Sequence, residues 1–143
     1  MRRAWILLVC LLSVPVQAEE LMAIRLPNGR TIHAELAHTP EARERGLMFR
    51  DELPPDGGML FAFEEDIERV FTMKETRVDL DFLFLDPHGR IRQIVEAVPH
   101  PATEAEDIAQ VRGQGAYVLE LPAGASRRHR LSVGTVLRFD PAP

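Results

Sequence analysis

The chain has 143 residues, a formal net charge of −5, and a composition that is 45% hydrophobic and 27% charged. This length fits one domain with a buried core of its own. The acidic balance argues against binding to nucleic acid or to anionic lipid, because both require a basic surface.

The N-terminus has the pattern of a cleaved export signal. Arg2 and Arg3 precede an apolar stretch that is too short to span a bilayer, for which ~20 residues are needed. Val16 and Ala18 then match the small-residue pattern of a cleavage site. We therefore expect residues 1–18 to be removed, leaving a single periplasmic or secreted domain over residues 19–143.

The mature domain would contain no cysteine, because Cys10 lies inside the signal. This cysteine follows Val9 and not the small residue that a lipidation site needs, so we predict no lipid anchor and no stable membrane insertion after cleavage. Thiol catalysis, a disulfide framework and Cys-ligated zinc are thereby excluded for the mature domain. Loss of the two leader arginines also makes its net charge more negative, at −7.

The first predicted element of the mature chain is a β-hairpin over residues 21–36. Its arms, LMAIRL and RTIHAEL, flank a Pro-Asn-Gly turn, and Asn-Gly is a strong signal for a short hairpin. A short helix follows. Thr39 is a suitable N-cap, Pro40 fits the first turn, and Gly46 can end the helix in a left-handed conformation.

Short strands dominate the rest of the chain. GMLFAF and ERVFTMKE predict two strands around an acidic turn, EEDIE, and RVDLDFLFLD and RIRQIVEAV predict a hairpin around the type I turn signal DPHG. A long polar crossing, PHPATEAEDIAQVRGQG, leads to the strand AYVLELP, the short helix AGASRRHR and the closing strand VGTVLRFD at 133–140. About eight short strands, one or two short helices and no alternating βα units predict a mainly β domain. An antiparallel β-sandwich or a partly closed barrel fits this pattern.

Four segments in this order together resemble a known family. They are RGLMFR (45–50), GMLF (58–61), FTMKETRVDLDFLFLDPHGRI (71–91) and YVLELPAG (117–124), followed by VGTVL. Their order and spacing are similar to those of the prokaryotic family known as domain of unknown function 192, or DUF192. The resemblance covers nearly all of the mature chain and implies a β-sandwich of jelly-roll type that is often exported. It implies no particular reaction.

The central segment departs from the pattern of that family, which usually resembles F-W-M-K-N-T-x-x-P-L-D. Thr72 stands in place of the aromatic residue, Glu75 in place of the amide, and Asp79 in place of the proline. If this segment lines a pocket, the pocket is more acidic and less aromatic than the family pattern implies.

Asp79 and Asp81 are the first candidates for chemistry. In an extended strand they point to the same side, roughly 6.5–7 Å apart, while Leu80 and Phe82 face the core. Asp81 would then lie at a boundary between solvent and core, where a raised pKa suits a general acid, and the spacing is compatible with the paired carboxylates of glycosidases. The alternative is that Asp79 is solvated and Asp81 is a structural acceptor for loop amides or an arginine. This alternative is favoured, since most acids in strands are structural or solvated.

A set of polar residues near the family segments forms the predicted ligand site: Arg45, Arg50, Lys74, Thr76 and Asp81. Lys74 is the only lysine in the chain, and either arginine can clamp a carboxylate with two hydrogen bonds. No metal or other cofactor is predicted, because the five histidines have no ligand spacing. Met48, Met59 and Met73 are thioether candidates for Cu(I), but methionine more often fills gaps in a core.

The favoured function is therefore binding of a small molecule, or an accessory role, in the periplasm. No reaction is assigned. One alternative is a hydrolase that acts on a cell-envelope or carbohydrate substrate, with Asp81 as acid or base. Another is a scaffold without a ligand. The sequence leaves the oligomeric state open.

Overall fold

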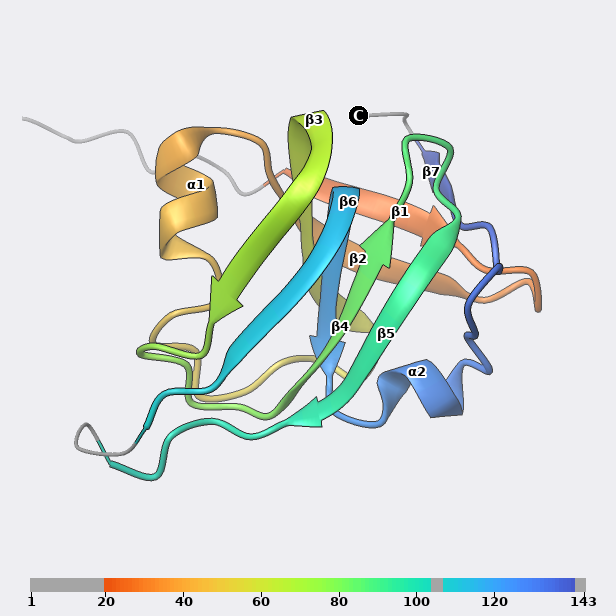
Figure 1. Cartoon of the computed structure of the whole chain (residues 1–143). Helices are drawn as coiled ribbons and strands as arrows, with labels where there is room; N and C mark the ends of the chain where they lie inside the picture. The colour runs from red at the N-terminus through yellow and green to blue at the C-terminus, as the bar shows by residue number, and fades with distance from the viewer. Residues whose placement is uncertain (1–19, 104–106, 141–143) are drawn as a thin grey trace, which may run out of the picture.

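The computed structural model describes residues 20–103 and 107–140, and the predicted export signal lies outside the described residues. Seven strands form one sheet in the order β5-β4-β6-β3-β2-β1-β7 (Figure 1). The β2–β3 pair is parallel and the other pairs are antiparallel, which makes the sheet mixed. The mainly β class with two short helices is confirmed. The elements are β1 (Leu21–Arg25), β2 (Thr31–Ala37), α1 (Pro40–Arg45), β3 (Gly57–Thr72), β4 (Leu80–Leu85), β5 (Ile91–Val98), β6 (Gln110–Pro122), α2 (Ala125–Arg128) and β7 (Arg138–Asp140).

The two edges of the sheet approach each other without closing a barrel among the described residues. Arg90 forms an isolated antiparallel bridge with Val136, and the amide of Ile91 donates to the carbonyl of Thr135 at 2.8 Å. The bridge is not extended into a ladder, so β7 is shorter than the closing strand that the sequence predicted.

The acidic segment EEDIE is part of a strand and not the turn that the sequence predicted. β3 runs without interruption for 16 residues, and it pairs with β6 on both sides of a register shift between Ala62 and Ile67. Glu64 and Glu65 are exposed at this irregularity. A bulge of this kind accommodates extra residues and bends the strand, which explains why charged residues interrupt the pattern without ending the strand.

β6 begins earlier than predicted, because the last part of the expected polar crossing, residues 110–115, belongs to it. From Gln110 to Gly115, polar residues alternate with Val111, Gly113 and Gly115, and the pairing with β3 extends as far as Gln110. Glycines on the inner side of the strand weaken the apolar signal of a period of two. Gly113 is required there, since a Cβ would lie 2.6 Å from the ring of Phe84.

Both faces of β4 are covered by core, so the expectation that one face of this strand is partly exposed to solvent is wrong. All six residues of β4 are buried. Leu80, Phe82 and Phe84 belong to one apolar cluster, and Leu83 and Leu85 belong to the other. β4 lies between β5 and β6, and this position buries it as in the middle of a two-faced sheet.

The two short helices lie far apart, α1 beside β3 and α2 below β5 (Figure 1). The turn at 86–89 forms as predicted, with the amide of Gly89 donating to the carbonyl of Asp86 at 3.0 Å. The turn joins β4 to β5, and the register of this hairpin shifts between Phe84 and Leu85. No helix within residues 20–103 and 107–140 has the length and apolarity needed to cross a bilayer.

Candidate functional site

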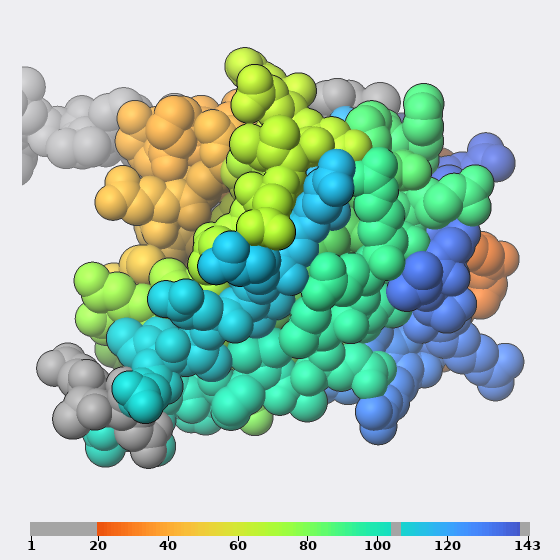
Figure 2. Space-filling view, in the orientation of Figure 1, coloured from red at the N-terminus to blue at the C-terminus, as the bar shows by residue number. Residues whose placement is uncertain are grey.

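A cavity of about 600 Å³ lies between α1, β3 and the loop after β3. In the space-filling view the α1 segment (orange) and the outer part of β3 (yellow-green) lie side by side on the surface (Figure 2). A volume of this size is typical of sites for small molecules. The cavity is lined by apolar residues (Gly46, Leu47, Met48, Phe61, Phe63, Val70, Phe71, Leu80) and by polar ones (Arg43, Glu44, Arg45, Glu68, Arg69, Thr72, Lys74, Thr76, Glu120).

The residues at the two ends of α1 determine where this helix begins, ends and packs beside the cavity. The hydroxyl of Thr39 accepts a hydrogen bond from the amide of Ala42 at 3.1 Å, which caps the helix as predicted. The helix ends at Gly46, whose φ of 47° lies in the left-handed region that favours glycine. A Cβ at this position would lie 3.3 Å from the ring of Phe61, so the end of the helix packs closely on β3. Arg45 in the last turn is thereby held at the rim.

The apolar wall of the cavity is aromatic. Phe71 makes edge-to-face contacts with Phe61, Phe63, Phe82 and Phe84, at centroid distances of 5.1, 6.4, 5.8 and 6.1 Å. Such pairs add about 0.5–1.5 kcal/mol each beyond the burial of their area. Three of these rings line the cavity and two of them are only partly buried, so a ligand would meet a rigid aromatic surface.

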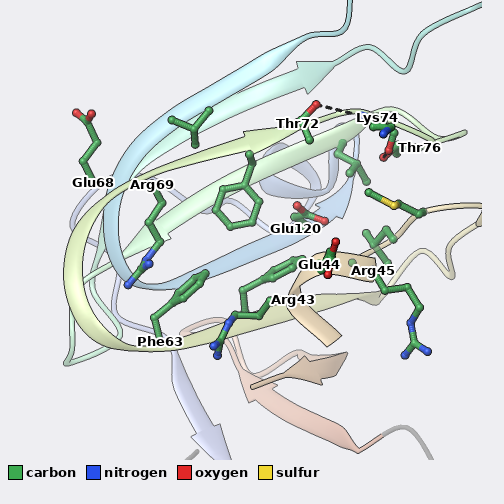
Figure 3. Close-up of a pocket in the computed structure, with 17 residues that line it drawn as sticks. Arg43, Glu44, Arg45, Phe63, Glu68, Arg69, Thr72, Lys74, Thr76 and Glu120 are labelled. Carbon is green, nitrogen blue, oxygen red and sulfur yellow. Dashed lines mark hydrogen bonds between the residues drawn. The ribbon is translucent and has the colours of Figure 1, made fainter. Parts of the chain in front are cut away.

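Glu120 is the buried acid of the cavity. It lies in β6 opposite Met59 of β3 and Phe82 of β4, and its residue is only 5% exposed. Gly58 lets the two strands approach here, because a Cβ at that position would collide with the carbonyl oxygen of Glu120. Figure 3 shows the carboxyl group among the residues that line the cavity.

The carboxyl group of Glu120 has no hydrogen-bond or ion-pair partner among the described residues. Burial alone raises its pKa to about 8, because a charged carboxylate is poorly solvated in apolar surroundings. The group is therefore mainly protonated at pH 7, and in this form it can both donate and accept a hydrogen bond. A buried titratable group with a strongly perturbed pKa in a cleft is a recognised mark of a functional site.

Two arginines stack on one aromatic ring at the cavity. The guanidinium carbon of Arg69 lies 3.5 Å from the centroid of Phe63, and that of Arg43 lies 5.1 Å from it. Arg43 donates to the carbonyls of His38 and Ala62 at 2.7 and 2.9 Å, so its position is fixed. In Figure 3 both arginines lie on the Phe63 side of Glu120, and Lys74 lies on the other side.

Three of the five residues predicted to bind a ligand line this cavity. Arg45 and Lys74 are exposed at its rim, and the buried Thr76 lies beside Lys74, whose carbonyl accepts its hydroxyl hydrogen bond at 3.4 Å. The neighbouring loops carry backbone strain. Glu75 and Phe49 have φ values of 55° and 63°, and the amide of Phe49 donates to the carbonyl of Glu75 at 2.8 Å. Left-handed residues other than glycine are uncommon and cluster at functional sites.

The other two predicted residues, Arg50 and Asp81, do not line this cavity. Arg50 binds Glu35 through two hydrogen bonds, at 2.8 and 2.5 Å. Asp81 has no exposed surface and points to the opposite face of β4, toward α2. It accepts hydrogen bonds from the amides of Ala97, Gly124 and Ser126 and from the Ser126 hydroxyl, at 2.9, 3.1, 2.9 and 2.6 Å.

Asp79 and Asp81 do not face a common cleft, so the geometry gives no support to the hypothesis of paired catalytic carboxylates. Asp79 is half-exposed and accepts from the amide of His100 at 2.9 Å, and its carboxylate lies 2.6 Å from the imidazole of the same residue. These contacts lower the pKa of Asp79, the backbone hydrogen bond most, since they stabilise the charged carboxylate. Asp81, by contrast, is enclosed by backbone amides and acts as a structural acceptor.

The three candidate thioethers do not converge on an accessible point. Met59 and Met73 are 3% and 0% exposed within the core, and of the three only Met48 lines the cavity. Across residues 20–103 and 107–140, no group of three or more His, Cys, Asp and Glu side chains is arranged to hold a metal ion.

Sequence reasoning missed Glu120, Arg43 and Arg69. Glu120 had one signal, a lone charge in the otherwise apolar strand VLELP, and the same signal drew attention to Asp81 in LDFLFL. The two arginines had none, because Arg69 looked like an ordinary polar residue of the predicted strand ERVFTMKE and Arg43 looked like an ordinary helix residue.

The model of the DUF192 family, described as "Uncharacterized ACR", matches residues 23–139. The chain belongs to the DUF192 family. Two crystal structures resemble this DUF192 protein, each with a TM-score of 0.71. One is of a Sinorhizobium meliloti protein suggested to be a transcription regulator; it is 43% identical, and the match covers 86% of this chain and 95% of that chain. The other is of a Novosphingobium aromaticivorans protein of unknown function; it is 26% identical, over 87% and 89% of the two chains. No curated protein matches the chain.

Proposed function

We propose that this DUF192 protein is an exported binding protein of the periplasm that holds a small molecule in the Glu120 cavity. The observation that carries the proposal is the buried Glu120 carboxyl group, which has no partner among the described residues and faces a cavity of about 600 Å³. The cavity gives a ligand access to this group, and a ligand that donates to it or accepts from it would supply the hydrogen bond that the described residues do not.

The surroundings of Glu120 favour binding over catalysis. The cavity combines an aromatic wall with a few polar groups, and this combination is usual for sites that hold organic molecules. Among the described residues that line it, no nucleophile lies beside a general base, so the lining provides recognition more readily than a reaction. The export signal predicted at residues 1–18 supports a location outside the cytoplasm.

The role suggested for the Sinorhizobium meliloti relative is not adopted for this chain. Proteins that regulate transcription by binding DNA present a basic surface, because phosphate contacts dominate their affinity. The net charge of −5 argues against such a surface.

Native mass spectrometry of the protein purified gently from a periplasmic fraction tests the proposal. We expect a reproducible extra mass that corresponds to a bound organic compound. Val70→Trp should abolish it, since Val70 is 50% exposed and lines the cavity. Ile67→Trp is the matched control, because Ile67 is 48% exposed in the same strand but does not line the cavity.

A bare mass would count against a tightly held ligand. If, in addition, no compound of a metabolite library raised the melting temperature of the wild type, the proposal would fail and the scaffold hypothesis would replace it. An adduct that survives Val70→Trp would place the ligand somewhere other than the cavity.

A further inference from the structure

We propose that the ligand is an organic anion with an apolar, aromatic body, and that its anionic group binds to the guanidinium groups of Arg43 and Arg69. This rests on the binding function proposed above and names the class of ligand. The body would lie against the Phe71 wall, and a polar group at its far end would reach Glu120.

The two guanidinium groups are held in place but retain free donors. Arg69 donates through Nε to the carbonyl of Gly115 at 3.3 Å and through Nη2 to the carbonyl of Glu65 at 2.5 Å, which leaves Nη1 without an acceptor among the described residues. Arg43 makes both of its hydrogen bonds through Nη1, so its Nη2 and Nε also have no acceptor among the described residues. Guanidinium groups that are fixed in advance lose little entropy when they bind an anion.

The two positive charges also repel each other. Burial and then the charge of Arg43 lower the pKa of Arg69, while the carboxylates of Glu65 and Asp66 act in the opposite direction. Asp66 is already bound to Arg92, at 2.6 Å. An anion placed against both arginines would relieve this repulsion and make hydrogen bonds to charged donors, which are stronger than neutral ones.

The charge of the whole lining favours an anion over a cation. Arg43, Arg45, Arg69 and Lys74 line the cavity, against two acids other than Glu120, namely Glu44 and Glu68. Glu68 is itself bound to Arg112, at 3.0 Å. With the Glu120 carboxyl mainly neutral at pH 7, four cations against two carboxylates leave the lining with a net positive charge, which disfavours an amine.

Three probes with one aromatic body test the ligand class: 2-naphthylacetate, 2-naphthylacetamide and 2-(2-naphthyl)ethylamine. They are anionic, neutral and cationic at pH 7 and nearly equal in size. Their affinities for the purified wild type are measured by isothermal titration calorimetry in low salt. We expect the acid to bind about tenfold or more tightly than the amide, and the amine to bind most weakly.

Variants of Arg69 identify the group responsible. Arg69→Met keeps a side chain against Phe63 without the charge, and it should weaken the acid about tenfold while leaving the amide unchanged. Arg69→Lys should retain part of the preference. The control is Arg138→Gln, because Arg138 is exposed in β7 and neither lines the cavity nor pairs with an acid that lines it; it should change neither affinity.

The possible failures are distinguishable. If the amide or the amine binds as tightly as the acid, and Val70→Trp abolishes that binding, the anion class is refuted while the cavity remains a binding site. If none of the three probes binds, the proposed ligand class is refuted. The mass of the purified protein then decides independently whether the cavity holds any ligand at all.

Discussion

Replacement of Glu120 by Gln should change the pH dependence of stability in a defined way. Burial raises the pKa of the Glu120 carboxyl from its ordinary value of 4.5 to about 8 in the folded protein. Between these two pH values the folded state holds a proton that the unfolded state has released. The free energy of unfolding must therefore decrease as the pH rises, and the contribution is fully present only below pH 4.5.

The size of the effect follows from the shift. Each pH unit well within this range costs about 1.4 kcal/mol, so the carboxyl group destabilises the folded state by roughly 4 kcal/mol at pH 8 relative to pH 4.5. Gln has nearly the same shape as the neutral carboxyl group and does not ionise. The variant should match the wild type near pH 5 and become progressively more stable than it up to pH 8, with a constant difference above that pH.

Urea denaturation of both proteins at pH 5, 6, 7, 8 and 9 measures the difference directly. Because other ionisable groups contribute equally to both proteins, their effects cancel in the comparison. Glu44→Gln is the control, since Glu44 is an exposed acid on the rim of the same cavity. Parallel stability curves for the wild type and Glu120→Gln would refute the assignment of Glu120 as a buried neutral acid.

Three further outcomes are expected. Asp81→Asn should lower the free energy of unfolding by about 2–3 kcal/mol, measured in urea, because three backbone amides lose a charged acceptor, while the affinity for naphthylacetate stays unchanged. Glu75→Asn should raise the free energy of unfolding by about 0.5–1 kcal/mol, and with it the melting temperature, because asparagine tolerates a φ of 55° better than glutamate. An unchanged or lower melting temperature would contradict this. The affinity for naphthylacetate should fall as the pH rises above about 8, because ionised Glu120 repels the anion, and Glu120→Gln should remove this dependence in calorimetry.

The parts of the fold that were predicted correctly depend on local chemistry. The N-terminal hairpin follows from Asn-Gly, since Gly29 adopts a φ of 82° in the turn. The short helix follows from Thr39 and Gly46, which cap it in the way their positions indicated. In each case residues within one turn of the chain determine the conformation, so the sequence alone was sufficient.

The errors arise where distant strands decide the outcome. EEDIE looks like a turn in isolation, but β6 pairs on both sides of it and holds it in β3. The inner glycines of β6 likewise carry no apolar signal, and only the close packing of Gly113 on Phe84 explains their place in a strand. The cavity was unpredictable for the same reason, because it forms between α1 and two segments of β3 that are brought together by the fold.

Asp81 and Glu120 show most clearly what the sequence lacks. Each is a lone acid in an apolar strand, and each is at least 95% buried. Asp81 faces α2 and accepts four hydrogen bonds, whereas Glu120 faces the cavity and accepts none from the described residues. The side chain that the fold already uses is therefore Asp81, and the side chain that is available to a ligand is Glu120.

The two acids can be distinguished by a single comparison at pH 8. Neutralising an acid that backbone amides stabilise removes favourable interactions, so Asp81→Asn should destabilise the protein. Neutralising an acid that is buried without partners removes an unfavourable charge, so Glu120→Gln should stabilise it. Opposite signs of the change in the free energy of unfolding would show that Asp81 stabilises the fold and that Glu120 does not. The same sign for both substitutions would remove the physical reason for placing a ligand in the cavity.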